Sequence, residues 1–472
     1  MSKFVYFLTK GCDSMGFTRD LVHYALTTKY EDIPEHALDV QKHSLLDIVG
    51  CMMGAWGLGE GCKEVMKYIE TTDKGGDCTI FGSDFKASAE AAALMNGSLA
   101  HALDFEDSQD IAMQHSNSVS TPLCLTIADM LGNVSGKDLL AAITIGSDIA
   151  CRLATAFNED QVNYGWYMQP VHGSMAGVIS GARLLGLTED QTMDAIAINT
   201  YMASGSAEVV NSKVSLIRAI RDGLASKSAM FSLLLAKSGI DARFEEAFEG
   251  KQGYFKSYTR DNFNIERASE GMGKIFFGEF TGFKPWACCR LTHPSVGALI
   301  DIMKANNLKG DDIESVHLIL SPVCKMVTQP VELRMKPDNA ATAKFSIPFS
   351  LGVAAKTLNP SLAEFEEDKL SDPWVLNFAQ KVSWDYDETL TKAQILDCRI
   401  SVVTNKGTFN DHVTAPFGSP EKPMTDEMFV EKFKGCAKYS SRQYSGERQN
   451  EIIEKILSVE KLDDIRSLTS LL

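Results

Sequence analysis

The sequence predicts a mainly helical protein that carries a second, α+β domain. Helical hydrophobic periodicity runs through nearly all of the first 275 residues, and it returns from about residue 425 to the C-terminus. Alternating and β-branched segments occur only between these two parts. The 472-residue chain is also too long for one ordinary hydrophobic core. We therefore expect a helical domain at 1–279 and 417–472 and an α+β domain at 280–416.

Several of the expected helices have recognisable ends. Pro34 is a favourable first-turn residue, and an alanine-rich helix begins near Ala87, because alanine has the highest helix propensity. Gly186 ends one helix, and Thr188 forms a capping box with Gln191 at the start of the next. Further helical patterns lie at 119–132, 137–157, 172–187 and 215–239.

The expected α+β domain contains three strand patterns. Residues 315–321 alternate in polarity, and 399–404 are β-branched. A hairpin-type turn at 405–407 leads into a third strand at 408–413. If the helical tail after this block packs back on the first domain, the block is an insertion in a helical body.

The composition excludes several classes of partner. The formal net charge is −16, whereas nucleic acids and anionic membranes are bound by basic surfaces. No stretch reaches the roughly 18 apolar residues of a membrane span, and the N-terminus lacks a signal-peptide pattern. The eleven cysteines are scattered without a CxxC pair, which is typical of a reducing compartment. We therefore predict a cytoplasmic protein without nucleic acid or membrane as partner.

The first candidate site follows the alanine-rich helix. His101, Asp104 and Ser108 are spaced i, i+3 and i+7, so they would share one face if the helix continues that far. His115 follows, just before a serine- and asparagine-rich turn. Such polar groups are costly to bury without partners, which favours a site. The alternative is a helix end with solvated acids and a core histidine.

Two later segments carry further candidates. Tyr167 and His172 flank a helix N-terminus, which favours anions, although a buried aromatic corner is the alternative. Arg218 and Arg221 are spaced i and i+3 in an acidic protein, which suits carboxylate recognition. A solvated helix face would have the same spacing.

The entrance to the second domain is the fourth candidate. The segment KPWACCRLTH at 284–293 brings together Lys284, Arg290, a histidine and two adjacent thiols. The thiols lack further ligands at zinc spacing, so we interpret them as core packing. The glycine-rich run at 57–61 lacks a preceding strand and the dinucleotide-binding spacing.

Across these segments the chain resembles the MmgE/PrpD family of 2-methylcitrate dehydratase and cis-aconitate decarboxylase, which also contains iminodisuccinate epimerase. The matching stretches are HALDFEDSQ (101–109), HSNS (115–118), GW…HGSMAGVISGARLLGL (165–187), IRAIRDGLAS (217–226), FEGKQGYF (248–255) and KPWACCRLTHPSVGAL (284–299). The resemblance runs over nearly the whole chain. It implies a homodimer whose helical domain is formed by both chain ends, with an inserted α+β lid over the site. It implies neither a metal nor an organic cofactor.

The resemblance also implies the positions of active-site residues. Asp104, Ser108, His115, Arg218 and Lys284 fall on family active-site positions, with Ser108 in place of threonine and Arg218 in place of lysine.

The chain also departs from the decarboxylases of the family. Tyr167 stands where these enzymes carry a histidine, Cys289 where they carry a second lid histidine, and Phe349 where they carry a lid tyrosine. Because three proton-handling groups are absent, we rank cis-aconitate decarboxylation lower.

The family reactions move a proton at a carbon beside a carboxylate, so the developing negative charge needs fixed cations. Arg218, Lys284 and Arg290 would supply them and hold the substrate carboxylates. His115 is the first candidate base and His172 the second. Tyr167 would be an acid on the opposite face.

Three hypotheses follow from this chemistry. The first is a lyase that dehydrates or hydrates a small hydroxy di- or tricarboxylate, with Asp104 orienting a histidine or accepting a substrate hydroxyl. The second is an epimerase or racemase of a small dicarboxylate such as iminodisuccinate. The third is a non-enzymatic dimer that binds carboxylates.

Overall fold

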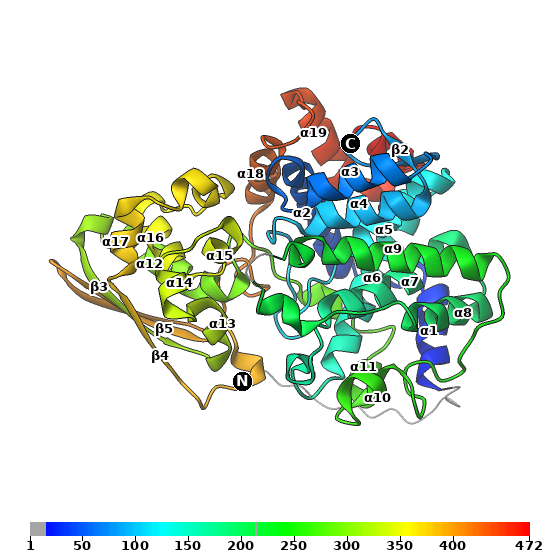
Figure 1. Ribbon diagram of the computed structural model, residues 1–472, viewed down its shortest axis with the longest axis horizontal. Helices are drawn as coiled ribbons and strands as arrows, with labels where there is room; N and C mark the ends of the chain where they lie inside the picture. Colours follow the sequence, from blue (N-terminus) through cyan, green and yellow to red (C-terminus); the bar gives the residue numbers. More distant parts are fainter. Residues whose placement is uncertain (1–15, 213–214) are drawn as a thin grey trace.

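The computed structural model describes residues 16–212 and 215–472 and consists mainly of helices with small sheets (Figure 1). The expected lack of a signal peptide concerns residues outside these ranges, and so does Cys12. Within the described ranges, no helix is long and apolar enough to cross a membrane. The ten described cysteines are all buried free thiols.

The first part of the chain is a stack of helices that agrees with the predicted periodicity. The long helices are α1 Phe17–Thr27, α2 Glu35–Leu58, α3 Cys62–Thr72, α4 Ala89–His101, α5 Ser120–Leu131, α6 Gly136–Thr155, α7 Gln169–Leu185, α8 Glu189–Thr200 and α9 Ile217–Lys237. Two short helices follow, α10 Tyr254–Thr259 and α11 Ile265–Ser269. Between α3 and α4 lies a two-stranded sheet, β1 Cys78–Thr79 and β2 Lys86–Ala87. The predicted capping box is confirmed, since Thr188 and Gln191 exchange hydrogen bonds at the start of α8.

Helices α4 and α9 approach each other closely because both present small residues. A Cβ atom added to Gly97 would lie 2.4 Å from Ser226 Oγ, and one added to Gly223 would lie 2.1 Å from Ser98 Oγ. Neither position therefore tolerates a side chain without a backbone shift. This contact sets α9, and with it Arg218, beside the end of α4.

The second part contains a four-stranded mixed sheet in the order β4-β3-β5-β6. Strand β3 runs parallel to β4 and antiparallel to β5, and β5 forms a hairpin with β6. The strands are β3 Ile313–Leu320, β4 Val382–Tyr386, β5 Cys398–Thr404 and β6 Gly407–Val413. The prediction missed β4, whose five residues alternate between apolar and polar side chains but make too short a run to stand out.

Helices cover the sheet of the second part on one side (Figure 1). They are α12 His293–Ala305, α13 Lys325–Thr328, α14 Val331–Met335, α15 Ala340–Lys344, α16 Ile347–Thr357 and α17 Pro373–Ala379. The longest of them, α12, contacts β5, β6 and α16. Alternate residues of β3 are buried, as expected for a strand with one covered face.

The C-terminal tail returns to the first part of the chain. It contains α18 Asp426–Ala437, α19 Gly446–Leu457 and α20 Arg466–Thr469. Helix α18 packs on α2, where Lys432 Nζ lies 2.5 Å from Asp47 Oδ1. The division into a helical domain at 1–279 and 417–472 and an α+β domain at 280–416 stays a prediction, and this contact favours it.

Candidate active site

The chain leaves the helical conformation at the end of α4. The helix ends at His101, and Asp104 has a φ of 50°, a left-handed conformation that is uncommon for residues other than glycine. Ser108 is buried and pairs through its backbone with Gly282. The helix therefore does not continue far enough for His101, Asp104 and Ser108 to share one helical face.

The carboxylate of Asp104 is the point where predicted residues from distant segments meet. Lys284 Nζ lies 2.7 Å from Oδ1, and Arg218 Nη2 lies 2.9 Å from Oδ2. His115 Nε2 lies 3.9 Å from Oδ1. Three of the residues selected from the sequence thus lie around the carboxylate of a fourth, Asp104. Ser108 is joined by its backbone to the segment that carries Lys284.

The cluster around Asp104 carries a surplus of positive charge. Burial alone would raise the pKa of Asp104, but Lys284, Arg218 and the histidines hold this pKa well below its usual range. Burial works against the charged forms of Lys284 and Arg218, yet their anionic neighbours raise both pKa values. All three groups are therefore ionised at neutral pH. Two cations on one carboxylate suit a second carboxylate from a ligand.

Tyr167 lies between the two arginines of α9. Its hydroxyl oxygen accepts hydrogen bonds from Arg221 Nη1 at 2.6 Å and Arg218 Nη1 at 3.1 Å. It donates to Gln169 Oε1 at 3.2 Å. The Arg221 guanidinium also lies 4.7 Å from the centre of the tyrosine ring. The two guanidinium groups would stabilise the oxygen if the hydroxyl gave up its proton.

The second part of the chain contributes two residues that the sequence did not single out. The ring of Phe345 lies 4.2 Å from the Arg218 guanidinium, and Lys344 Nζ donates to the carbonyl oxygen of Leu103. Phe349, at the position expected for a lid tyrosine, is fully buried in α16 with its ring near Phe365. No motif marks Phe345 or Lys344, so only the tertiary contacts reveal them.

His172 lies in an aromatic environment. Its Nδ1 is 2.7 Å from the hydroxyl of Tyr254, and its ring contacts Phe157 in a T-shaped arrangement at 5.0 Å. The side chain is buried. These contacts favour the aromatic corner that the sequence offered as the alternative to a site, and the role of His172 as second candidate base stays a prediction.

Arg290 is engaged by the protein itself. It binds Asp110 through Nε at 3.1 Å and Nη2 at 3.0 Å. Its Nη1 donates to the carbonyl oxygens of Phe283 and Phe417. These contacts connect Arg290 to the loops at the start of the second part, and its role in substrate binding stays a prediction.

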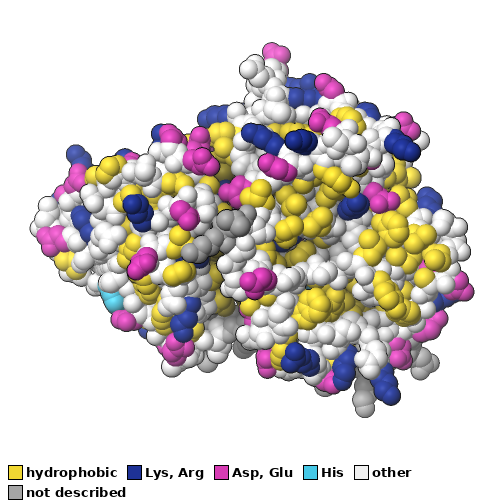
Figure 2. All heavy atoms as spheres, in the orientation of Figure 1, with side chains coloured by type: hydrophobic (Ala, Val, Ile, Leu, Met, Phe, Trp, Pro, Cys, Tyr) yellow, Lys and Arg dark blue, Asp and Glu magenta, His cyan; other side chains and the backbone are white. Residues whose placement is uncertain are grey.

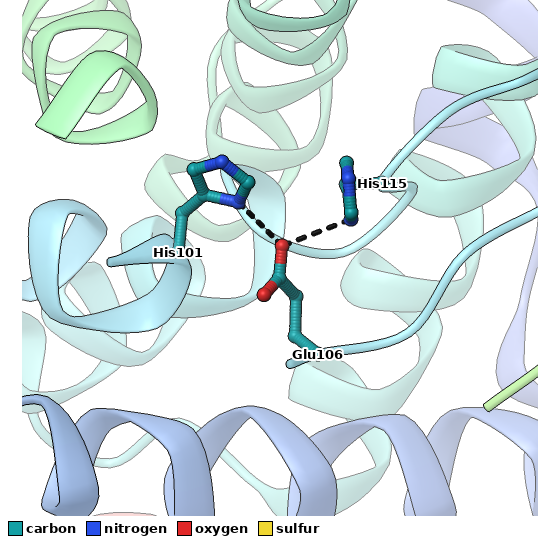
Figure 3. Close-up of side chains that lie close together, drawn as sticks. All are labelled: His101, Glu106 and His115. Carbon is teal, nitrogen blue, oxygen red and sulfur yellow. Dashed lines mark hydrogen bonds and ion pairs between the residues drawn. The ribbon is translucent and has the colours of Figure 1, made fainter. Parts of the chain in front are cut away.

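A buried carboxylate, Glu106, links two histidines next to the cluster. Figure 3 shows His101 and His115 on either side of Glu106, both directed at the same oxygen. The distances to Glu106 Oε1 are 2.5 Å from His101 Nδ1 and 2.9 Å from His115 Nδ1. The sequence analysis missed Glu106, although its proximity to His101 and Asp104 in the same polar stretch was a usable signal.

Most of the chain matches the two domain models of one protein family. The N-terminal domain of the MmgE/PrpD family matches residues 19–266, and its C-terminal domain matches residues 286–458. A cis-aconitate decarboxylase of Aspergillus terreus is 26% identical over 97% of this chain and 96% of the relative. The cis-aconitate decarboxylase-like protein oryM of Aspergillus oryzae is 26% identical over 96% and 97%. The cis-aconitate decarboxylase of Homo sapiens is 24% identical over 84% and 82%. The chain therefore belongs to the MmgE/PrpD family.

Proposed function

We propose that the protein is a cofactor-independent lyase that dehydrates or hydrates a small hydroxy di- or tricarboxylate. The observation that carries the proposal is the convergence of Arg218 and Lys284 on one carboxylate, with His115 Nε2 at 3.9 Å from it. Such a group can bind a carboxylate and act on the adjoining C–H bond. The relatives named as cis-aconitate decarboxylases support a tricarboxylate as the substrate class.

In the proposed reaction, Arg218 and Lys284 hold the substrate carboxylate. His115 Nε2 takes the proton from the adjoining carbon, and the electron pair of the C–H bond forms the double bond. The hydroxyl group leaves as water with a proton from Tyr167, whose oxygen is stabilised by Arg218 and Arg221. Hydration is the same sequence of steps in reverse.

Decarboxylation is the second candidate, because the relatives carry that name. Loss of CO₂ leaves a carbanion, which the same cations would stabilise until it takes up a proton. This candidate ranks second because Tyr167, Cys289 and Phe349 replace three proton-handling residues that the resemblance assigns to the decarboxylases. Epimerisation stays an alternative that requires proton exchange on two faces of one carbon.

A screen of small di- and tricarboxylates in D₂O, followed by NMR, tests these alternatives together. Dehydration creates a vinyl signal, and decarboxylation yields CO₂ and a product with one carboxylate fewer. Epimerisation incorporates deuterium without a new double bond. Binding without exchange or conversion of any ligand would overturn the proposal and favour a non-enzymatic carboxylate-binding dimer.

A homodimer is part of the proposal. Figure 2 shows hydrophobic side chains gathered on the face where α4 and α9 lie. Ile217 and Leu224 of α9 are 49% and 43% exposed, and Tyr201 after α8 is 85% exposed. Exposed apolar patches of this kind typically mark protein interfaces. Light scattering should give twice the chain mass, and Leu224→Glu should weaken the dimer while Leu131→Glu, at the end of α5, should not.

The cytoplasm is the proposed location. Ten free cysteines in the described part of the chain suit a reducing compartment. Fractionation of cells that express the tagged protein tests this location, and recovery in a secreted fraction would contradict it.

A further inference from the structure

The Glu106 carboxylate is fully buried, and its Oε1 lies 2.9 Å from Nδ1 of His115, whereas Nε2 of the same ring lies 3.9 Å from Asp104 Oδ1. Burial alone would raise the pKa of Glu106, but the two histidines outweigh this effect and hold the pKa well below its usual range. Glu106 is therefore an ionised acceptor at neutral pH. Its role rests on the proposed function, in which His115 is the base.

The contacts of His115 determine which ring nitrogen carries the hydrogen. Nδ1 lies 2.9 Å from Glu106 Oε1 and 3.0 Å from the carbonyl oxygen of Asp107. Both oxygens only accept hydrogen bonds, so Nδ1 must be the protonated nitrogen of the neutral ring. Nε2 then has a free lone pair, and it is the atom that lies 3.9 Å from Asp104 Oδ1.

His101 holds Glu106 from the other side. Its Nδ1 lies 2.5 Å from the same Glu106 oxygen and 3.5 Å from Asp222 Oδ2. Burial lowers the pKa of His101 despite these carboxylates, so the ring is neutral and donates through Nδ1. Asp222 is itself bound by Arg221 Nε at 3.1 Å. Glu106 thus receives two N–H groups on one oxygen, which restricts its orientation.

We propose that Glu106 is a positioning residue for His115. It holds the ring in the Nδ1–H form with Nε2 directed at the substrate site, and it stabilises the imidazolium that forms during the reaction. The proton passes from the substrate carbon to Nε2, while the hydrogen on Nδ1 stays on His115 and Glu106 stays a carboxylate. A carboxylate behind a catalytic imidazole acts in this way in other enzymes.

The same three side chains could be taken for a metal site. His101 Nδ1, Glu106 Oε1 and His115 Nδ1 lie within 4.8 Å of one another, and zinc binds such atoms. A metal-bound Nδ1 carries no hydrogen, however, and the Asp107 carbonyl oxygen lies 3.0 Å from Nδ1 of His115. The single in-plane lone pair of Nδ1 would then be bound to the metal, and this carbonyl oxygen would lie at hydrogen-bond distance from a nitrogen that has no hydrogen to donate. The observed contacts therefore favour hydrogen bonds.

The test replaces the carboxylate by an amide of equal size. Glu106→Gln should lower kcat by about 10²- to 10³-fold and change KM by less than about threefold, because Arg218 and Lys284 are untouched. The acidic limb of the kcat/KM profile should move to lower pH by about 1 pH unit, since the imidazolium loses its anionic neighbour while Asp104, Lys284 and His101 remain. Glu106→Asp, which keeps the charge, should recover at least about tenfold of the lost kcat.

Glu366→Gln is the matched control. This carboxylate accepts a hydrogen bond from Tyr439, remote from the cluster, so its loss should leave kcat and the pH profile unchanged. Equal kinetic parameters for Glu106→Gln and the wild-type protein would overturn the proposal. A pH profile that does not move, with kcat reduced, would reveal a merely structural role and overturn it as well.

A second readout does not depend on activity. Nitrogen-15 NMR of histidine side chains in the full-length protein, assigned with His115→Gln, should show the His115 hydrogen on Nδ1. In Glu106→Gln, the population with the hydrogen on Nε2 should increase. A wild-type hydrogen on Nε2, or one metal ion per chain in elemental analysis, would overturn the proposal even if the variant does not fold. If no carboxylate is converted but the NMR result holds, the proposed function fails and the positioning of His115 stands.

Discussion

Two arginine–aspartate pairs, one fully buried and one partly exposed, differ in how completely the protein satisfies their charges. Arg152 Nε lies 2.6 Å from Asp148 Oδ2, and both side chains are fully buried. Asp148 also accepts hydrogen bonds from Tyr24 and from the backbone of Phe277. Arg152 makes three further hydrogen bonds, to the carbonyl oxygens of Ala268, Glu270 and Ile275. Here the charges are matched by the protein on all sides.

The pair of Arg218 and Asp104 has a different environment. Its side chains are 23% and 14% exposed, and the carboxylate is shared with a second cation, Lys284. An imidazole, His115, lies next to it. Comparison of the two pairs teaches that buried charge alone does not mark a site. A site is marked by surplus charge beside an acid–base group. The two kinds of pair should therefore respond differently to substitution.

The imidazole is the strongest point of difference, because no histidine in the described part of the chain is paired with Asp148 or Arg152. His115→Ala should lower kcat/KM by about 10⁴-fold, the upper range for general base catalysis, while the circular dichroism spectrum of the folded protein is retained. His172→Ala serves as the contrast, since His172 lies in the aromatic corner. Its loss should reduce kcat/KM by less than about tenfold. A larger loss from His172→Ala than from His115→Ala would reverse the assignment of the base.

Stability should depend more on Arg152 than on Arg218, in contrast to activity. Arg152→Ala leaves Asp148 as an uncompensated buried charge and should lower the free energy of unfolding by about 3–5 kcal/mol. Arg218→Ala should lower it by less than about 1 kcal/mol, because Lys284 still compensates Asp104. Urea unfolding followed by circular dichroism measures both values. Equal destabilisation would mean that the two pairs do not differ in their role.

The fold was largely predictable because its helices carry local signals. Periodicity and the Thr188–Gln191 capping box describe contacts within one helix, and these were confirmed. Strand β4 was missed because a short strand is defined by its partner, β3, which is distant in sequence. The same reason explains the end of α4, where the left-handed conformation of Asp104 depends on tertiary contacts rather than on helix propensity.

The candidate site was predictable only in part. Asp104, His115 and Lys284 were selected by residue type and by the resemblance to the family. Glu106 was missed although it lies in the same polar stretch as His101 and Asp104, and Phe345 was missed because a phenylalanine in a helical segment carries no signal of its own. Their partners lie on segments that only the folded chain brings together.

Substrate binding should depend on Arg218 more than on Arg290, the buried arginine at the start of the second part of the chain. Arg218→Ala should lower kcat/KM by about 10²-fold, with KM raised and kcat reduced together, because the guanidinium would contact both substrate and transition state. Arg290→Ala should mainly lower the unfolding free energy, since Arg290 is bound to Asp110. Steady-state kinetics and ligand titration with a carboxylate test this. Unchanged carboxylate affinity in Arg218→Ala would exclude its role in binding.

The smallest expected effect concerns a second aspartate, three residues after Asp104. Burial, and then the charge of Asp47, raise the pKa of Asp107 to about 7, while the hydrogen bonds from Ser44 and Asn117 lower it. The pKa values of Asp104 and Asp107 are thus shifted in opposite directions within one short stretch. Cations surround Asp104, whereas Asp107 is fully buried with a carboxylate nearby. The folded protein keeps a proton on Asp107 between about pH 4 and pH 7 that the unfolded chain has released.

The stability that this proton provides is present below about pH 4 and is lost as the pH rises through about 7. The free energy of unfolding should therefore fall by roughly 1 kcal/mol per pH unit from Asp107 alone, or roughly 2 kcal/mol between pH 5 and pH 7. Asp107→Asn should remove this part of the slope in urea unfolding experiments. Asp104→Asn should leave the slope in this range unchanged, because the low pKa of Asp104 places its titration below pH 4. Parallel slopes for the wild-type protein and Asp107→Asn would show that Asp107 is ionised in the folded protein, and the opposite environments inferred for the two aspartates would then be wrong.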